Sequence, residues 1–225
     1  MSGRPAAHTR LVPLEIEGPA GKLEALLQEH EARDHAIAAL VCHPHPLYGG
    51  TLHNKVVHRA ASTLHALGAA VLRFNFRGAG ASEGAHDGGP GETEDARVAL
   101  RFLAARYPHA RRWLAGFSFG AWIAARLAAA ESGIERLILI APPVSTSSFE
   151  PLESLAIPKL VIQGGADDVC KPAALHEPFR RWAEPKRLVE VPGANHFFDR
   201  QLGALADAMR EALAEAARGG ASCTA

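Results

Sequence analysis

The stretch Gly116-Phe117-Ser118-Phe119-Gly120 places a serine between two glycines, after an apolar run and before an alanine-rich helical pattern. Glycines lack Cβ atoms, so a strand and a helix can meet there at a sharp turn from which the serine projects. The helix would direct its first N–H groups and the positive end of its dipole toward the serine oxygen. This arrangement suits a nucleophilic serine. The pentapeptide alone is equally compatible with a turn whose serine caps the helix, so the choice depends on the rest of the chain.

A serine hydroxyl is a poor nucleophile at neutral pH and needs a base, together with an acid that orients the base. His196 is the best candidate base, because it follows a short strand in a loop rich in glycine and asparagine. The candidate acids are Asp167 and Asp168, in the loop after the preceding strand. Taken singly, either aspartate could cap a helix and the histidine could lie on the surface. Together they follow the order serine, aspartate, histidine that is expected after such a pentapeptide.

The elements that must position these residues alternate along the chain. Strands are expected at 11–17 and 22–28 (a hairpin), 36–42, 69–76, 110–117, 136–141, 159–163 and 187–191. Helices are expected at 54–67, 94–107, 119–131, 173–182 and 201–218. From residue 36 onward, strand and helix alternate, which predicts right-handed crossovers and a three-layer α/β/α sandwich. Its sheet should be mostly parallel, with about seven to eight strands.

The candidate residues should meet at one edge of this sheet. In open parallel sheets, the active crevice lies at the carboxyl ends of the strands. The loops at 43–50, 116–120, 164–168 and 192–196 all follow strands and therefore share that edge. The alternation predicts that segments distant in the sequence build one site there.

Composition narrows the class of protein. The 225 residues are 48% apolar and 21% charged, with 24 basic and 24 acidic side chains, so neither nucleic acid nor an anionic membrane is favoured as a partner. No apolar run reaches the ~20 residues of a membrane span, and no apolar leader begins the chain. Three cysteines are too few and too scattered for a disulfide framework. We expect a cytoplasmic protein with a single domain at 1–218 and a disordered tail at 219–225.

Two further motifs could indicate a metal or a cofactor. Four histidines lie close together in the sequence, but no Cys, Asp or Glu accompanies them at ligand spacing: His43, His45, His53 and His58. The stretch 77–82 resembles a dinucleotide-binding loop, but Glu83 occupies the position of the third glycine. We therefore expect neither a metal nor a cofactor.

These residues, in this layout, resemble an α/β-hydrolase: the pentapeptide around Ser118, then Asp167, then Asn195-His196-Phe197-Phe198. The runs 43–51 and 73–78, the latter followed by Gly80 and Ser82, resemble those of small, lidless bacterial hydrolases related to dienelactone hydrolases and carboxylesterases. The similarity covers nearly the whole chain.

The resemblance implies an α/β-hydrolase fold with Ser118 as nucleophile, His196 as general base and Asp167 as the orienting acid. The pattern Gly-x-x-Asp from Gly164 favours Asp167 over Asp168. The chain departs from the usual continuation, because the segment 169–172 is one residue longer before its proline.

A transition-state oxyanion also needs N–H donors. Phe119, at the start of the helix, is one candidate. The second should come from the loop 43–50, where the two prolines have no N–H, which leaves Leu47 first and His45 second.

The expected activity is cleavage of small soluble carboxylic esters through an acyl-serine intermediate. The segment between Ala141 and Lys159 is too short for a lid domain. The substrate pocket is expected from 47–53, 82–91 and 143–150. The alternatives are a peptidase or thioesterase with the same triad, or a non-catalytic binding protein of this fold. The sequence leaves the oligomeric state open, with a homodimer among the options.

Overall fold

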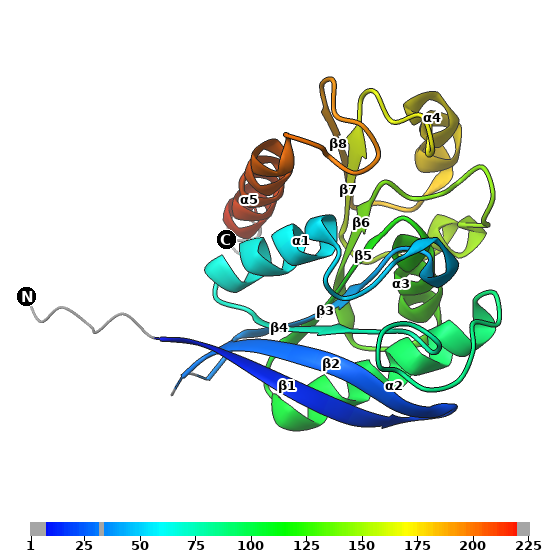
Figure 1. Cartoon of the computed structure of the whole chain (residues 1–225). Helices are drawn as coiled ribbons and strands as arrows, with labels where there is room; N and C mark the ends of the chain where they lie inside the picture. Colours follow the sequence, from blue (N-terminus) through cyan, green and yellow to red (C-terminus); the bar gives the residue numbers. More distant parts are fainter. Residues whose placement is uncertain (1–7, 32–33, 220–225) are drawn as a thin grey trace, which may run out of the picture.

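A sheet of eight strands, counted over residues 8–31 and 34–219 that the computed structural model describes, forms the middle layer of the molecule (Figure 1). The strands are β1 (Thr9–Gly18), β2 (Gly21–His30), β3 (Ile37–Cys42), β4 (Ala70–Phe74), β5 (Arg111–Phe117), β6 (Ile134–Ile140), β7 (Lys159–Gly164) and β8 (Lys186–Val191). Their order is β1-β2-β4-β3-β5-β6-β7-β8. Strands β4, β3 and β5 to β8 are mutually parallel. The predicted mostly parallel sheet is therefore confirmed.

The predicted N-terminal hairpin is present as β1 and β2, which pair antiparallel. It joins the sheet through β2, which runs antiparallel to β4 with Ala25 opposite Phe74. The hairpin extends the sheet at the edge far from β8, as Figure 1 shows.

Helices cover both faces of the sheet. They are α1 (Lys55–Ala66), α2 (Pro90–Arg106), α3 (Phe119–Ala130), α4 (Pro172–Arg181) and α5 (Leu202–Gly219), with short 3₁₀ turns η1 (Pro46–Tyr48) and η2 (Glu150–Glu153). Helices α1 and α5 pack on one face, and α2 and α3 on the other (Figure 1). Strand β3 is buried throughout, and its successive residues Leu40 and Val41 belong to the cores of opposite faces. Burial on both faces explains why its sequence is a continuous apolar run.

Helix α2 differs most from its predicted bounds, and the other four helices begin and end within one residue of theirs. Helix α2 begins at Pro90 instead of residue 94, because the buried Glu92 carboxylate accepts a hydrogen bond from the Gly89 N–H at 2.7 Å and closes the first turn. Helix α5 continues to Gly219, where the tail was expected to begin. The rest of that tail, 220–225, and residues 1–7 lie outside the described residues. No helix in the described part of the chain is long and apolar enough to cross a bilayer.

Candidate active site

Ser118 occupies the sharp turn between β5 and α3 that the pentapeptide predicts. Its φ of 53° lies in the left-handed region, which a non-glycine residue rarely adopts. A Cβ on Gly116 would collide with the backbone oxygen of Gly120, and a Cβ on Gly120 would collide with the backbone oxygens of Cys42 and His43. Both glycines are therefore required by the close approach of β5, α3 and the end of β3.

Ser118, His196 and Asp167 form a continuous hydrogen-bonded row. The Ser118 Oγ lies 3.2 Å from His196 Nε2, and His196 Nδ1 lies 2.8 Å from Asp167 Oδ2. The imidazole and the carboxylate are buried, with 4% and 3% of each residue exposed. Asp168, the other candidate acid, is exposed. The structure thus brings together the three residues that the resemblance implies.

The Asp167 carboxylate is held by four hydrogen-bond partners. Its Oδ1 accepts from the N–H groups of Val169 at 2.9 Å and Cys170 at 2.7 Å. Its Oδ2 accepts from Gln163 Nε2 at 3.0 Å as well as from His196. Because a carboxylate is an acceptor here, the proton of the neutral imidazole lies on Nδ1 and the Nε2 lone pair faces Ser118. Sequence reasoning missed Gln163, although a polar residue inside a buried apolar strand was a signal for it.

The loop after β3 presents the candidate oxyanion donors. The Leu47 N–H donates to Nδ1 of His45 at 3.3 Å, and the Leu47 side chain is 70% exposed. The His45 ring packs 4.9 Å from the ring of Phe119, and the His45 N–H has no partner among the described residues. The N–H of Leu47, the first-choice donor, is therefore already hydrogen-bonded to the His45 ring. The side chain of His45, the second choice, packs against Phe119.

A cavity of about 200 Å³ opens at the nucleophile. This nucleophile cavity is lined by His45, Tyr48, Ser118, Phe119, Pro143, Ser145, Thr146, Ser147, Val169 and Cys170. Of the stretches predicted to line it, 47–53 and 143–150 contribute, whereas no residue of 82–91 is among the lining residues. That segment supports the wall of the cavity, because the His86 ring packs 4.6 Å from His45 and 5.6 Å from Phe119. Val169 and Cys170, which follow β7, also line the cavity and were not predicted.

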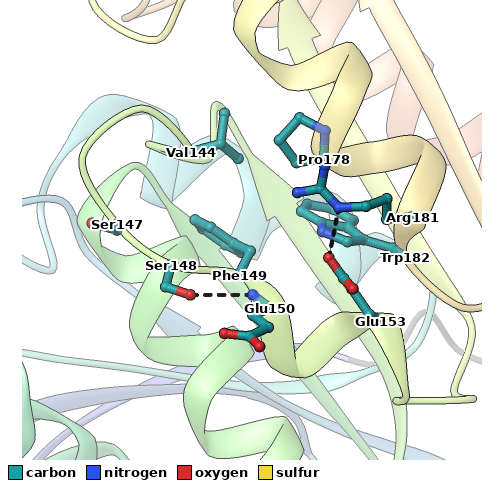
Figure 2. A pocket seen from close by; sticks show the side chains of 9 residues that line it. All are labelled: Val144, Ser147, Ser148, Phe149, Glu150, Glu153, Pro178, Arg181 and Trp182. Carbon is teal, nitrogen blue, oxygen red and sulfur yellow. Dashed lines mark hydrogen bonds and ion pairs between the residues drawn. The ribbon is translucent and has the colours of Figure 1, made fainter.

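A second cavity, of about 400 Å³, lies between the segment 144–153 and the end of α4. This α4 cavity is lined by Val144, Ser147, Ser148, Phe149, Glu150, Glu153, Pro178, Arg181 and Trp182 (Figure 2). Figure 2 shows the Arg181 guanidinium reaching the Glu153 carboxylate, at 2.8 Å. Ser147 borders both cavities. Glu150 and Glu153 thus line the α4 cavity and are not among the residues that line the nucleophile cavity.

His43, one of the four histidines that lie close together in the sequence, is fully buried, and both of its ring nitrogens are hydrogen-bonded to the backbone. Its Nδ1 donates to the Pro44 oxygen at 2.6 Å, and its Nε2 accepts from the Phe76 N–H at 2.9 Å. Burial lowers the pKa of the imidazole to about 4. A neutral ring with both nitrogens engaged offers no lone pair to a metal.

The fold and the row ending at Ser118 define the class of α/β serine hydrolases. A family model described as serine aminopeptidase, S33, matches residues 39–152. An uncharacterized protein of Rickettsia prowazekii is 38% identical over 192 residues, which cover 81% of this chain and 80% of that protein.

Comparison with solved structures points to the same class of protein. An α/β serine hydrolase without a lid from Xanthomonas campestris is 38% identical, with a TM-score of 0.85 over 94% of this chain and 97% of that one. An α/β serine hydrolase homologue from Coxiella burnetii is also 38% identical, with a TM-score of 0.84 over 89% and 96%. The chain belongs to the α/β-hydrolase superfamily and to the family of the matching model.

Proposed function

We propose that this hydrolase cleaves small, uncharged carboxylic esters through an acyl-enzyme formed on Ser118. The observation that carries the proposal is the row from Ser118 through His196 to Asp167, which ends in a cavity of about 200 Å³. A row of this kind can deprotonate a serine hydroxyl and hold the resulting imidazolium.

In the first step, Ser118 Oγ attacks the ester carbonyl while its proton passes to His196 Nε2. The Oγ–C bond forms as the carbonyl π electrons move to the oxygen, which becomes an oxyanion. Asp167 remains ionised, keeps the imidazole in its Nδ1–H tautomer, and stabilises the imidazolium.

The oxyanion would be stabilised by two backbone N–H groups. The Phe119 N–H at the start of α3 is one donor. Because it lies at the N-terminus of the helix, the positive end of the helix dipole also stabilises the oxyanion. For the second we assign His45 in preference to Leu47, because the Leu47 N–H already donates to His45 Nδ1. Loss of one such donor typically reduces transition-state stabilisation by ~3–4 kcal/mol.

Collapse of the tetrahedral intermediate breaks the bond to the alkoxy oxygen, which takes the proton from His196 and leaves as the alcohol. Water then enters, gives a proton to His196 Nε2, and attacks the acyl carbon. A second collapse releases the acid and returns the proton to Ser118 Oγ.

The size and lining of the nucleophile cavity support this substrate class. Its volume is below the ~300–1,000 Å³ of clefts that hold drug-sized ligands, so the group bound there is small. The lining residues in the described chain include no Asp, Glu, Lys or Arg. An ionised group would lose hydration in this cavity without gaining a counter-charge, which favours an uncharged substrate.

An aminopeptidase is the second candidate, because that is the description of the matching family model. Such an enzyme must bind the free α-ammonium group of its substrate, for which a carboxylate is the natural partner. The nucleophile cavity has none among its lining residues, and Glu150 and Glu153 lie in the α4 cavity. This separation favours the esterase.

The test compares p-nitrophenyl acetate, butyrate and octanoate with alanine p-nitroanilide, using the wild type, Ser118→Ala and His196→Ala. We expect the short esters to be cleaved fastest, and both variants to lose turnover and labelling by a fluorophosphonate probe. Preference for the anilide would replace the esterase by the aminopeptidase. If the folded wild type is not labelled and cleaves none of these substrates, the esterase proposal is wrong and the alternative of a non-catalytic binding protein is favoured.

A further inference from the structure

Three side chains of metal-ligating type meet beside Ser118. One donor atom each of Asp167, Cys170 and His196 lie within 4.8 Å of one another, and all three residues are buried. Cys170 lines the nucleophile cavity together with Ser118. Thiolate, imidazole and carboxylate are the three ligand types that zinc takes in proteins.

We propose that Cys170 and His196 form a binding site for a thiophilic divalent cation, Zn²⁺ or Cd²⁺, which inhibits hydrolysis by taking the position of the proton between Ser118 and His196. The inhibition rests on the proposed function, whereas the binding of the cation does not.

The hydrogen bonds of the triad determine which atoms coordinate. His196 Nδ1 is occupied by Asp167 Oδ2 at 2.8 Å, so Nε2 is the nitrogen available to the cation. Asp167 then remains behind the imidazole as the outer carboxylate, the arrangement that fixes the tautomer of metal-binding histidines. Zn–S and Zn–N bonds of ~2.3 and ~2.1 Å bridge a sulfur and a nitrogen up to ~4.4 Å apart. The Cys170 sulfur lies within 4.8 Å of one of the two imidazole nitrogens, so rotation of the Cys170 side chain must bring it within that span of Nε2. Water or the Ser118 oxygen completes the shell.

Binding is an exchange of one proton for the cation. The Cys170 S–H bond breaks, its proton passes to solvent, and the thiolate and the Nε2 lone pair form the two bonds to the metal, with no change of oxidation state. Burial raises the pKa of the free thiol to about 12, so without a metal Cys170 is a neutral thiol. Because one proton is released, binding should strengthen with rising pH.

The ligand set also predicts selectivity. Sulfur and nitrogen donors favour Zn²⁺ and Cd²⁺, whereas Mg²⁺ and Ca²⁺ require oxygen ligands. Magnesium chloride at matched ionic strength is therefore the control for non-specific effects of charge.

The binding test uses the full chain carrying Cys223→Ser, which removes a thiol outside the described residues. Cd²⁺ is titrated while the ultraviolet thiolate-to-Cd²⁺ absorption is followed. We expect one equivalent to bind. The signal should disappear in Cys170→Ala, and it should persist in Ser118→Ala, which lacks the nucleophile. Cys42→Ala is the matched control, since Cys42 is a fully buried thiol in β3. A signal unchanged in Cys170→Ala, or absent in the parent protein, would overturn the site.

The kinetic test follows ester hydrolysis with increasing Zn²⁺, each variant being compared with its own uninhibited rate. We expect inhibition that EDTA reverses, with a half-inhibitory concentration at least ~10-fold higher in Cys170→Ala, because loss of even a supporting group weakens metal sites ~10–100-fold. Cd²⁺ binding without ester turnover in any condition would retain the metal site and remove the esterase. Turnover that is equally sensitive to Zn²⁺ in Cys170→Ala would retain the esterase and remove the metal site.

Discussion

The Phe76 N–H donates to His43 Nε2 over 2.9 Å, and this bond ties the loop after β3 to the end of β4. The same imidazole donates from Nδ1 to the Pro44 oxygen at 2.6 Å. His43 therefore supports the loop that carries His45 while remaining uncharged. Protonation of Nε2 would place two N–H donors against each other and break the tie.

This tie predicts a loss of stability in acid. The pKa of His43 is lowered to about 4 from the ordinary value of 6.5, so between these values the unfolded chain binds more protons than the folded one. The stabilisation is complete above pH 6.5 and is lost as the pH falls toward 4. Its size is roughly 3 kcal/mol.

Urea denaturation between pH 4 and 7 measures this pH-dependent contribution of His43 to the free energy of unfolding. His43→Gln can still accept a hydrogen bond from Phe76 but does not titrate, so its unfolding free energy should depend less on pH than that of the wild type. The difference between the two proteins isolates His43 from other histidines whose pKa burial lowers, such as His58 and His65. Parallel pH profiles would contradict the role of His43.

The two neighbouring aspartates should differ sharply in their effect on turnover. Asp167→Asn keeps the shape of the residue but cannot stabilise an imidazolium, and it favours the wrong tautomer of His196. We expect kcat to fall about 10,000-fold. Asp168→Asn is the matched control, because Asp168 is exposed and its side chain lies outside the row. Equal losses in the two variants would rule out Asp167 as the specific orienting acid.

Gly120 should tolerate no side chain. The Cβ of Gly120→Ala would lie 2.4 Å from the backbone oxygens of Cys42 and His43, and backbone atoms cannot rotate away as the end of a side chain can. We expect an unfolding free energy lower by more than ~4 kcal/mol, or no soluble protein. Gly203→Ala in α5 is the control, because its Cβ would meet nothing within 4 Å and should stabilise the helix by ~0.5–1 kcal/mol. Thermal unfolding of the two variants provides the comparison.

The order of strands and helices could be predicted because the buried strands contain apolar runs, of which 37–42 in β3 is continuous, and because glycine and proline recur in the segments between them. The meeting of the candidate serine, aspartate and histidine also followed from that order, since all parallel strands end at one edge, whereas the choice of Asp167 over Asp168 came from the resemblance. Contacts that depend on polar side chains could not be predicted in this way. The start of α2 depends on Glu92 turning back to Gly89, which apolar periodicity does not record.

The same limit applies to the site. Choosing between Leu47 and His45 requires knowing that a 3₁₀ turn directs the Leu47 N–H to the His45 ring. The position of Cys170 depends on the extra residue after Asp167, which lets two consecutive N–H groups reach one carboxylate oxygen. Sequence patterns identify the residues that do chemistry more readily than those that surround them.

The pair Arg77 and Asp95 should be the most consequential ion pair outside the site. Arg77 donates to Asp95 from Nε at 3.0 Å and from Nη2 at 2.7 Å, and the Asp95 carboxylate is fully buried. Arg77→Met would leave that carboxylate without its counter-charge, so we expect a loss of about 3–5 kcal/mol in urea denaturation. The double variant Arg77→Met/Asp95→Leu should recover much of this loss, because it removes the stranded charge together with its partner. Arg210→Met breaks an exposed pair with Asp207 and should leave the midpoint unchanged. If the double variant were as unstable as Arg77→Met alone, the loss would come from packing of the arginine stem and not from the buried charge.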